Sequence, residues 1–292
     1  MKLAIDIGSN TIKGILGENV GGRVSAAFEQ TLGLRICADG NSLVPGAAAM
    51  IAGAISHFKK IASGISKHFE TEVVATSALR DSPQRDSVVA EVMRLTGEKI
   101  RVLSGEEEAF LSYKGAVSGM DNPRPCTYFD LGGGSLEVVY GDGKKPVLSC
   151  SMPVGAVRMT KKFLTGESCG GAKKLSEYLD GVFSENLSNM PSGADLIGAG
   201  GAVAAARFMK ERICPGDNPA IISATDLQNM ARIALSSTPK ELVGKYSIEP
   251  SRSDIIAAAF LTMHRLCLFL KAGCIRQTFF NLKHGIILED NK

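Results

Sequence analysis

Hydrophobic positions along the 292-residue chain recur with two periods, one typical of strands and one typical of helices. In the first part of the chain, Gly-rich or polar turns separate the segments, and Ser104 with Glu107 forms the capping box of a helix start. The pattern predicts three strands, a helix, a strand, a helix, a strand and a helix. We expect these elements at residues 2–8, 11–17, 23–35, 45–63, 72–80, 82–97, 99–105 and 106–118.

The segment DNPRP at residues 121–125 interrupts both patterns and is the expected domain boundary. After it, the order of three strands, helix, strand and helix starts again, and the remaining residues have a helical pattern. The sequence therefore predicts an α/β protein with two βββαβα-type lobes, at residues 1–121 and 122–292, and a cleft between them. In the second lobe, strands and helices are expected within residues 126–132, 135–142, 145–154, 157–164, 171–188 and 194–208.

Composition and charge exclude several classes of protein. At 45% hydrophobic and 22% charged residues, the chain is typical of a globular protein. The net charge of +3 includes no strongly basic block, so duplex nucleic acid is not expected as a partner, whereas a small polyanion is compatible with it. The seven cysteines include no CxxC pair, which disfavours a disulfide framework and a structural zinc site.

The chain enters its first strand without a charged and apolar leader. No segment is apolar over the length that a membrane span requires. We therefore expect a cytoplasmic protein with no membrane partner.

Two stretches combine a strand, an Asp, a Gly-containing turn and a second strand. Asp6 precedes the turn at residues 8–11, and Asp130 precedes the turn at residues 132–135. Backbone N–H groups in such turns converge on anions, so two acids beside them favour a divalent cation between acid and phosphate. For either turn alone, a hairpin whose Asp caps its own turn is the alternative. The candidate phosphate-binding residues are Gly8, Ser9, Asn10, Thr11, Gly132, Gly133, Gly134 and Ser135, and the candidate metal ligands are Asp6 and Asp130.

A third Gly-rich run, LIGAGGAVAAARF, has Gly200 and Gly201 between a strand and an Ala-rich helix. The start of such a helix presents N–H groups and the positive end of the helix dipole, which suits a phosphate or a nucleotide. Close packing of the strand against the helix is the alternative explanation of these glycines.

Three charged residues are candidates for chemistry on phosphate. In SGEEEA, Glu108 falls on a different side of the helix start from its acidic neighbours and is placed to orient a water. Glu137 lies on the strand that leaves the second turn, and an exposed Glu at a strand end is the alternative. Arg80, at the end of ATSALR, offers a forked pair of donors to phosphate unless it is an ordinary surface arginine.

These stretches resemble those of the exopolyphosphatase and guanosine pentaphosphate phosphohydrolase family, a branch of the actin, sugar kinase and heat-shock ATPase superfamily. The resemblance rests on AIDIGSNTIK, ATSALR, SGEEEA, FDLGGGSLEVVYG, SMPVGAVRMTKKF and IGAGGAVAA, and the pairing of SGEEEA with DLGGGS-x-E is specific to this branch. It implies two ribonuclease H-like (actin-like) lobes. It also implies hydrolysis of the terminal phosphate of inorganic polyphosphate or guanosine pentaphosphate with Mg²⁺ or another divalent cation.

The resemblance also implies roles for individual residues. Glu108 is expected to activate or orient the attacking water, and Glu137 to assist it. Asp6 and Asp130 are expected at the metal site. The expected phosphate-holding residues are Asn10, Thr11, Arg80, Gly133, Gly134 and Ser135.

The chain departs from the family pattern at several positions. Lys13 stands where the family often has Arg, Ala199 and Ala202 stand where a hydroxyl residue is common, and NLKHG (281–285) stands where the family usually has GLREG. The chain also ends where longer relatives continue into helical domains. These departures leave open a non-catalytic sensor of phosphorylated nucleotides or polyphosphate. A kinase of the superfamily, in which Glu108 has no role, and a homodimer are also left open.

Overall fold

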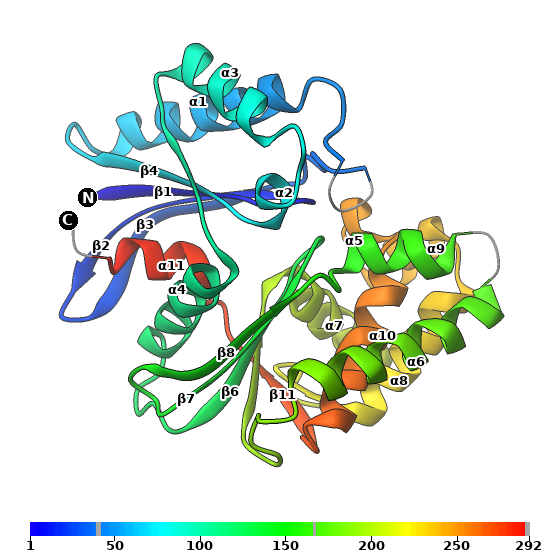
Figure 1. The fold of residues 1–292 in the computed structure, drawn as a ribbon. Helices are drawn as coiled ribbons and strands as arrows, with labels where there is room; N and C mark the ends of the chain where they lie inside the picture. Colours follow the sequence, from blue (N-terminus) through cyan, green and yellow to red (C-terminus); the bar gives the residue numbers. More distant parts are fainter. Residues whose placement is uncertain (39–41, 166–167, 290–292) are drawn as a thin grey trace. The chain divides into compact units, whose positions relative to one another are not determined.

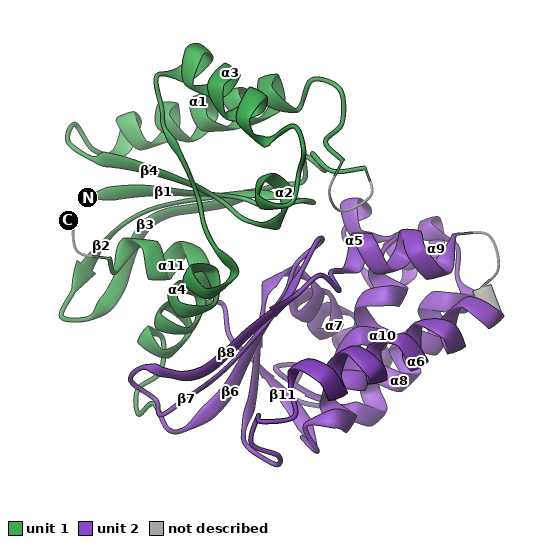
Figure 2. Cartoon of the chain, viewed as in Figure 1, with its two compact units in different colours: residues 1–123, 280–292 green, residues 124–279 purple. Residues whose placement is uncertain are grey.

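The computed structural model describes residues 1–38, 42–165 and 168–289, without the side chains of residues 168 and 169. The chain divides into two compact units (Figure 2). Unit 1 comprises Met1–Pro123 and Phe280–Lys292, and unit 2 comprises Arg124–Phe279. The sequence-based boundary at residues 121–122 lies close to the observed one. The expected second lobe, however, ran to residue 292, whereas the chain from Phe280 onward groups with unit 1.

Unit 1 contains one five-stranded sheet in the order β3-β2-β1-β4-β5 (Figure 1). The pairs β3-β2 and β2-β1 are antiparallel, and the pairs β1-β4 and β4-β5 are parallel. Strand β1 is buried on both faces, which is why its apolar residues run without alternation up to the Asp. The elements are β1 (Lys2–Ile7), β2 (Ile12–Val20), β3 (Arg23–Leu32), α1 (Ala47–Ile65), β4 (Glu70–Ala75), α2 (Ser77–Arg80), α3 (Arg85–Thr96), β5 (Ile100–Val102), α4 (Gly105–Ser118) and α11 (Leu282–Ile287).

Two hydrophobic cores lie on opposite faces of this sheet. Helices α1 and α3 cover one face, where Leu3 and Phe58 are buried. Helices α4 and α11 cover the other face, where Ala4, Leu111 and Ile286 are buried (Figure 1). The polar residues at the end of β1 therefore lie beside a face that the C-terminal helix covers.

Helices α4 and α11 approach each other closely at two glycines. A Cβ atom at Gly115 would collide with the carbonyl of Asn281, and one at Gly285 would collide with the carbonyl of Leu111. Backbone therefore packs against backbone at both positions, because no side chain separates the helices. This contact holds the C-terminal helix in unit 1.

Unit 2 contains a six-stranded sheet in the order β10-β11-β9-β6-β7-β8. Strands β6, β7 and β8 form antiparallel hairpins, and β9 runs parallel to both β6 and β11. A large core that includes Phe129, Phe183 and Phe260 lies between the sheet and its helices. The elements are β6 (Cys126–Leu131), β7 (Leu136–Gly141), β8 (Pro146–Met152), α5 (Ala156–Met159), a π-helical turn (Thr160–Leu164), α6 (Ser168–Asn186), β9 (Leu196–Ala199), α7 (Gly200–Ile213), β10 (Ile221–Ser223), α8 (Ala224–Ser236), α9 (Pro239–Tyr246), a 3₁₀ turn (Pro250–Arg252), α10 (Ile256–Phe269) and β11 (Cys274–Gln277).

The predicted order of three strands, helix, strand and helix is confirmed in both units. Two element predictions are wrong. The strand expected at residues 72–80 ends at Ala75, because the N–H groups of Leu79 and Arg80 donate to the carbonyl of Thr76 and close a helical turn. The region expected to be wholly helical after residue 208 contains β10 and β11, which are too short to give a strand pattern.

The remaining findings concern membrane spans and thiols. In the part of the chain that the structure describes, no helix combines the length and apolarity needed to cross a membrane. The cysteines whose side chains are described, at 37, 126, 150, 214, 267 and 274, are free thiols. The side chain of Cys169 lies outside the described residues.

Candidate active site

The turn between β1 and β2 in unit 1 is fixed by hydrogen bonds to its carbonyl groups. The N–H of Gly8 donates to the carbonyl of Thr11 at 3.0 Å, and the carbonyls of Ser9 and Asn10 accept from the N–H groups of residues 37 and 35. A trans peptide points its N–H opposite to its carbonyl, so the N–H groups of Asn10 and Thr11 face away from the segment at residues 35–37. These are the two backbone amides that the turn could offer to an anion.

Asp6 lies just before this turn and is buried. It is directly opposite Lys13 in the β1–β2 ladder, and Lys13 Nζ lies 3.3 Å from Asp6 Oδ2. Opposite residues in an antiparallel pair share a face of the sheet, which accounts for the ion pair. The carboxylate predicted as a metal ligand is therefore balanced by a cation in this structure.

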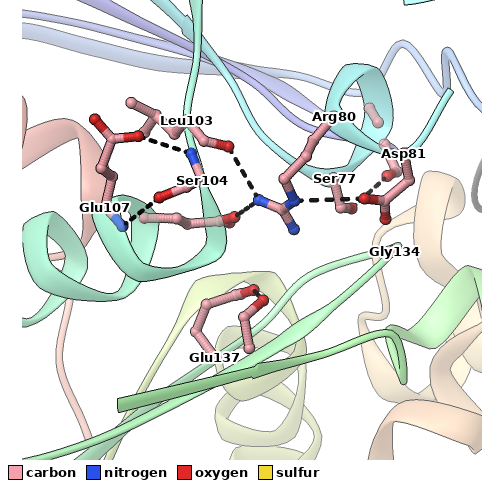
Figure 3. A network of polar contacts seen from close by, with 12 residues as sticks. Ser77, Arg80, Asp81, Leu103, Ser104, Glu107, Gly134 and Glu137 are labelled. Carbon is pink, nitrogen blue, oxygen red and sulfur yellow. Dashed lines mark hydrogen bonds and ion pairs between the residues drawn. The ribbon is translucent and has the colours of Figure 1, made fainter. Parts of the chain in front are cut away.

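Arg80 and Glu108 meet in unit 1 through a short ion pair. Arg80 Nη1 donates to Glu108 Oε2 at 2.6 Å and to the carbonyl of Leu103 at 3.4 Å, and Arg80 Nε lies 3.4 Å from Asp81 Oδ1 (Figure 3). Glu108 is 7% exposed. The guanidinium therefore holds one oxygen of this buried carboxylate in a fixed direction.

The start of α4 explains why Glu108 points inward. Ser104 accepts from the N–H of Glu107, and the Glu107 side chain accepts from the N–H of Ser104, so the predicted capping box is confirmed (Figure 3). Glu106 and Glu107 are exposed, and the next residue turns to the buried side of the helix. The sequence-based distinction between Glu108 and its acidic neighbours agrees with this placement.

The Gly turn of unit 2 is held by the start of α5. The carbonyls of Gly132, Gly133 and Gly134 accept from backbone N–H groups of residues 155–158, at 2.9 to 3.2 Å. The N–H groups of Gly133, Gly134 and Ser135 therefore face away from α5. A Cβ atom at Gly155 would collide with the turn, so this glycine, which the sequence analysis did not single out, is needed for the contact.

Asp130, Glu137 and Ser151 are cross-strand neighbours in unit 2. Asp130 pairs with Glu137 between β6 and β7, and Glu137 pairs with Ser151 between β7 and β8. Ser151 Oγ donates to Glu137 Oε1 at 2.8 Å, and Glu137 is 2% exposed. The alternative of an exposed Glu at a strand end is therefore wrong.

Burial and the negative charge of Glu137 raise the pKa of the nearby Cys150 thiol. Cys150 adjoins Ser151 on β8 and lies opposite Val138 in the ladder. This thiol is therefore kept in its protonated form beside the buried carboxylate.

The third Gly-rich run lies against Asp130 and Arg252. Gly200 has a φ of 87°, and a Cβ atom there would collide with Asp130 Oδ1. A Cβ atom at Gly201 would collide with the guanidinium of Arg252, whose Nε donates to Glu249 Oε2 at 3.1 Å. Arg252 is not among the predicted site residues, because nothing in its local sequence connects it to a glycine some fifty residues earlier.

The described residues include no cluster of three or more His, Cys, Asp or Glu side chains suited to a metal ion. Asp6, near the end of β1, belongs to unit 1, and Asp130, near the end of β6, belongs to unit 2. Carboxylate oxygens are hard ligands, and Mg²⁺ in phosphate-handling sites commonly uses one or two of them together with phosphate oxygens and waters. A single carboxylate in each unit would therefore need phosphate oxygens and waters to complete the coordination of such an ion.

The two mixed sheets, each with an Asp-Gly hairpin at the end of its first strand, define an α/β protein of the actin-like fold class. The chain belongs to the Ppx/GppA phosphatase family, whose family model matches residues 29–292. The match begins after the first hairpin. The family match therefore does not include residues 6–11, and the roles expected for these residues rest on the geometry of the β1–β2 hairpin.

Curated relatives include two exopolyphosphatases of Mycobacterium tuberculosis. Exopolyphosphatase 1 is 32% identical over 197 residues, which cover 63% of this chain and 56% of that protein. Exopolyphosphatase 2 is 28% identical over 291 residues, which cover 90% of this chain and 88% of that protein. An uncharacterized protein of Streptomyces coelicolor is 32% identical over 168 residues, which cover 56% of this chain and 49% of that protein. The chain thus spans about half the length of the Streptomyces protein and of Exopolyphosphatase 1.

Solved structures with the same fold include an exopolyphosphatase from Cytophaga hutchinsonii. Its TM-score is 0.84 at 17% identity, with 98% of this chain and 96% of that chain covered. A Ppx/GppA family member from Aquifex aeolicus has a TM-score of 0.78 at 20% identity, with 98% and 95% covered. At these identities the likeness concerns the fold, and it confirms the predicted class of two actin-like α/β lobes.

Proposed function

We propose that the chain is a phosphoanhydride hydrolase that releases terminal phosphate from inorganic polyphosphate. The observation that carries the proposal is the buried Glu108 carboxylate held by Arg80 at 2.6 Å. In a hydrolase, a carboxylate at this position can orient water and accept its proton, whereas a kinase of the same superfamily gives this residue no such use. The names of the two mycobacterial exopolyphosphatases support polyphosphate as the substrate class.

In the proposed mechanism, Glu108 orients the attacking water and takes its proton. Arg80 fixes the direction of the Glu108 carboxylate. Glu137, whose orientation Ser151 sets, is the assisting carboxylate. The transition state of phosphoryl transfer carries charge on its equatorial oxygens, so positioning and charge stabilisation supply most of the catalysis.

Phosphate oxygens are the ligands proposed for the amides of the two turns. In unit 1 these are the N–H groups of Asn10 and Thr11, and in unit 2 those of Gly133, Gly134 and Ser135. Gly8, Ser9, Gly132, Gly200 and Gly201 shape the same turns and the start of α7. Asp6 and Asp130 would hold Mg²⁺ or another divalent cation, which neutralises charge on the phosphate chain when bound.

A phosphate-release assay with polyphosphate, guanosine pentaphosphate and ATP tests this function. We expect release from polyphosphate in the presence of a divalent cation and loss of release when a chelator is added. Release from guanosine pentaphosphate alone would move the substrate to the phosphorylated nucleotide. Tight binding of either compound without release at high protein concentration would contradict the hydrolase and favour a sensor.

A further inference from the structure

Arg35, in the segment that follows β3 in unit 1, contacts the first turn and has no part in the proposed mechanism. Its N–H donates to the carbonyl of Asn10 at 3.0 Å, and its Nε donates to Asn10 Oδ1 at 3.0 Å. Asn10 is 3% exposed. Arg35 therefore holds both the backbone and the side chain of one buried residue of the turn.

The backbone of Arg35 has a conformation that favours glycine. Its φ is 25°, and the other described non-glycine residues with positive φ are Ser247 and Lys271. Ser247 is the C-cap of α9 and Lys271 follows the C-cap of α10, where left-handed residues commonly end a helix. Arg35 lies at no helix end. Strained residues of this kind cluster at functional sites, where the surrounding structure fixes them.

The residues after Arg35 fix it from the hydrophobic core. Ile36 and Cys37 are buried in the core on the face that α1 and α3 cover, and the N–H of Cys37 donates to the carbonyl of Ser9 at 3.3 Å. A glycine at position 35 would adopt the observed φ without steric cost and would keep the same backbone bond. The guanidinium is thus what an arginine adds here, and its described partner is the side chain of Asn10.

The bond from Arg35 determines which end of the Asn10 amide faces a ligand. A carboxamide has an acceptor, Oδ1, and a donor, Nδ2, whereas a guanidinium has donors only. Arg35 therefore selects the amide oxygen and leaves Nδ2 on the other branch of the planar group. Phosphate oxygens are acceptors, so the Nδ2 end is the one that binds them, and the Oδ1 end would repel them.

We propose that Arg35 is a positioning residue for phosphate binding: its bond to Asn10 Oδ1 orients the Asn10 amide so that Nδ2 donates to phosphate. The inference rests on the proposed function, since it uses the turn at residues 8–11 as a phosphate site. Because Arg35 acts through Asn10, its loss weakens phosphate binding and leaves proton transfer at Glu108 in place. A guanidinium that acted only by its charge would have the same effect whether or not Asn10 were present.

The test measures binding of tripolyphosphate to the intact chain by isothermal titration calorimetry. Arg35→Ala removes the guanidinium, and we expect the affinity to fall by about tenfold. Arg35→Lys keeps the positive charge but has a carbon atom in place of Nε, so we expect nearly the same loss. Arg23→Ala is the control, because it removes one arginine from an exposed ion pair on β3 and should leave the affinity unchanged.

Coupling to Asn10 separates positioning from a charge effect. Asn10→Ala removes the amide, and the double variant with Arg35→Ala is expected to bind tripolyphosphate as weakly as Asn10→Ala alone. Arg35→Gly separates positioning from damage to the fold. Glycine relieves the strain at this φ, so we expect Arg35→Gly to unfold at a higher temperature than Arg35→Ala and to bind tripolyphosphate equally weakly. Arg35→Gly also decides the question if Arg35→Ala does not fold.

Additive losses in the double variant, restored affinity in Arg35→Lys, or unchanged affinity in folded Arg35→Gly would overturn the inference. An original chain that does not bind tripolyphosphate would overturn it as well. None of these measurements requires turnover, so a chain that shows the coupling but releases no phosphate contradicts the proposed hydrolase and supports the inference. In a chain that releases phosphate, Arg35→Gly is expected to raise KM for polyphosphate by about tenfold with kcat unchanged.

Discussion

Arg80 donates to Glu108 at 2.6 Å from a different helix, and the two residues are 28 positions apart in the sequence. The short helix α2 carries the arginine, and the capped start of α4 carries the glutamate. Each helix is held by its own backbone hydrogen bonds, so both residues of the Arg80–Glu108 ion pair lie on helices and not on a loop. This contact gives the proposed water-orienting carboxylate a defined direction.

Glu108→Gln is expected to lower kcat for phosphate release by about 10² to 10⁴, because an amide does not take a proton from water. The amide keeps the size of the side chain and one oxygen that accepts from Arg80. Initial rates of phosphate release at saturating polyphosphate measure the effect. Glu106→Gln is the control, since Glu106 is exposed in the same helical turn. Glu108→Gln with near-normal turnover would move the catalytic role to another residue.

Arg80→Lys is expected to lower kcat/KM by at least about tenfold, because a lysine loses the planar fork that contacts Glu108, Leu103 and Asp81 together. Steady-state kinetics with polyphosphate separate the effects on kcat and KM. Arg85→Lys, at an exposed ion pair with Asp86, is the control and should leave both constants unchanged. Equal kinetics for the two variants would show that the fork of Arg80 has no part in the reaction.

The sequence predicts those parts of the site that local chemistry determines. Glu108 is distinguished from Glu107 because a capping box uses one side of a helix start, and both residues are local to it. Arg252 and Gly155 are not predicted, because Arg252 contacts the first turn of α7 and Gly155 contacts the Gly turn, and both contacts join residues distant in the sequence. The sequence also does not predict that α11 packs in unit 1. The reason is the same, because Gly115 on α4 and Gly285 on α11 each contact the other helix only in the folded chain.

His284→Asn tests a pH effect on stability. Burial and the charges of Lys283 and Lys13 lower the pKa of His284 to about 3 from 6.5, although Glu29 Oε2 lies 3.7 Å from its Nε2. Between these two pKa values the unfolded chain binds a proton at this residue and the folded chain does not. This histidine's contribution to stability is therefore fully present above pH 6.5 and is lost as the pH falls toward 3.

The expected result is a shallower fall of stability with acid in the variant than in the original chain. The difference in slope is at most about 1.4 kcal/mol per pH unit in that window. Asn keeps an acceptor in place of Nδ1, which accepts from the N–H of Asn281. Urea unfolding at several pH values between 4.5 and 7.5 gives the two curves, and parallel curves would contradict the assignment.

Gly200→Ala is expected to destabilise unit 2 and to impair cation binding, for two separable reasons. Its φ of 87° is strained for any residue with a Cβ atom, and the added Cβ would also collide with Asp130 Oδ1. Gly216→Ala tests the backbone strain alone, because Gly216 has a φ of 107° and open space around its Cβ position.

Thermal unfolding and Mn²⁺ titration of both variants measure the two effects. We expect both variants to lose stability by about 1 to 2 kcal/mol from strain, and only Gly200→Ala to weaken Mn²⁺ binding. Equal Mn²⁺ affinity in the two variants would remove Asp130 from the proposed cation site, because only the alanine at position 200 displaces its carboxylate.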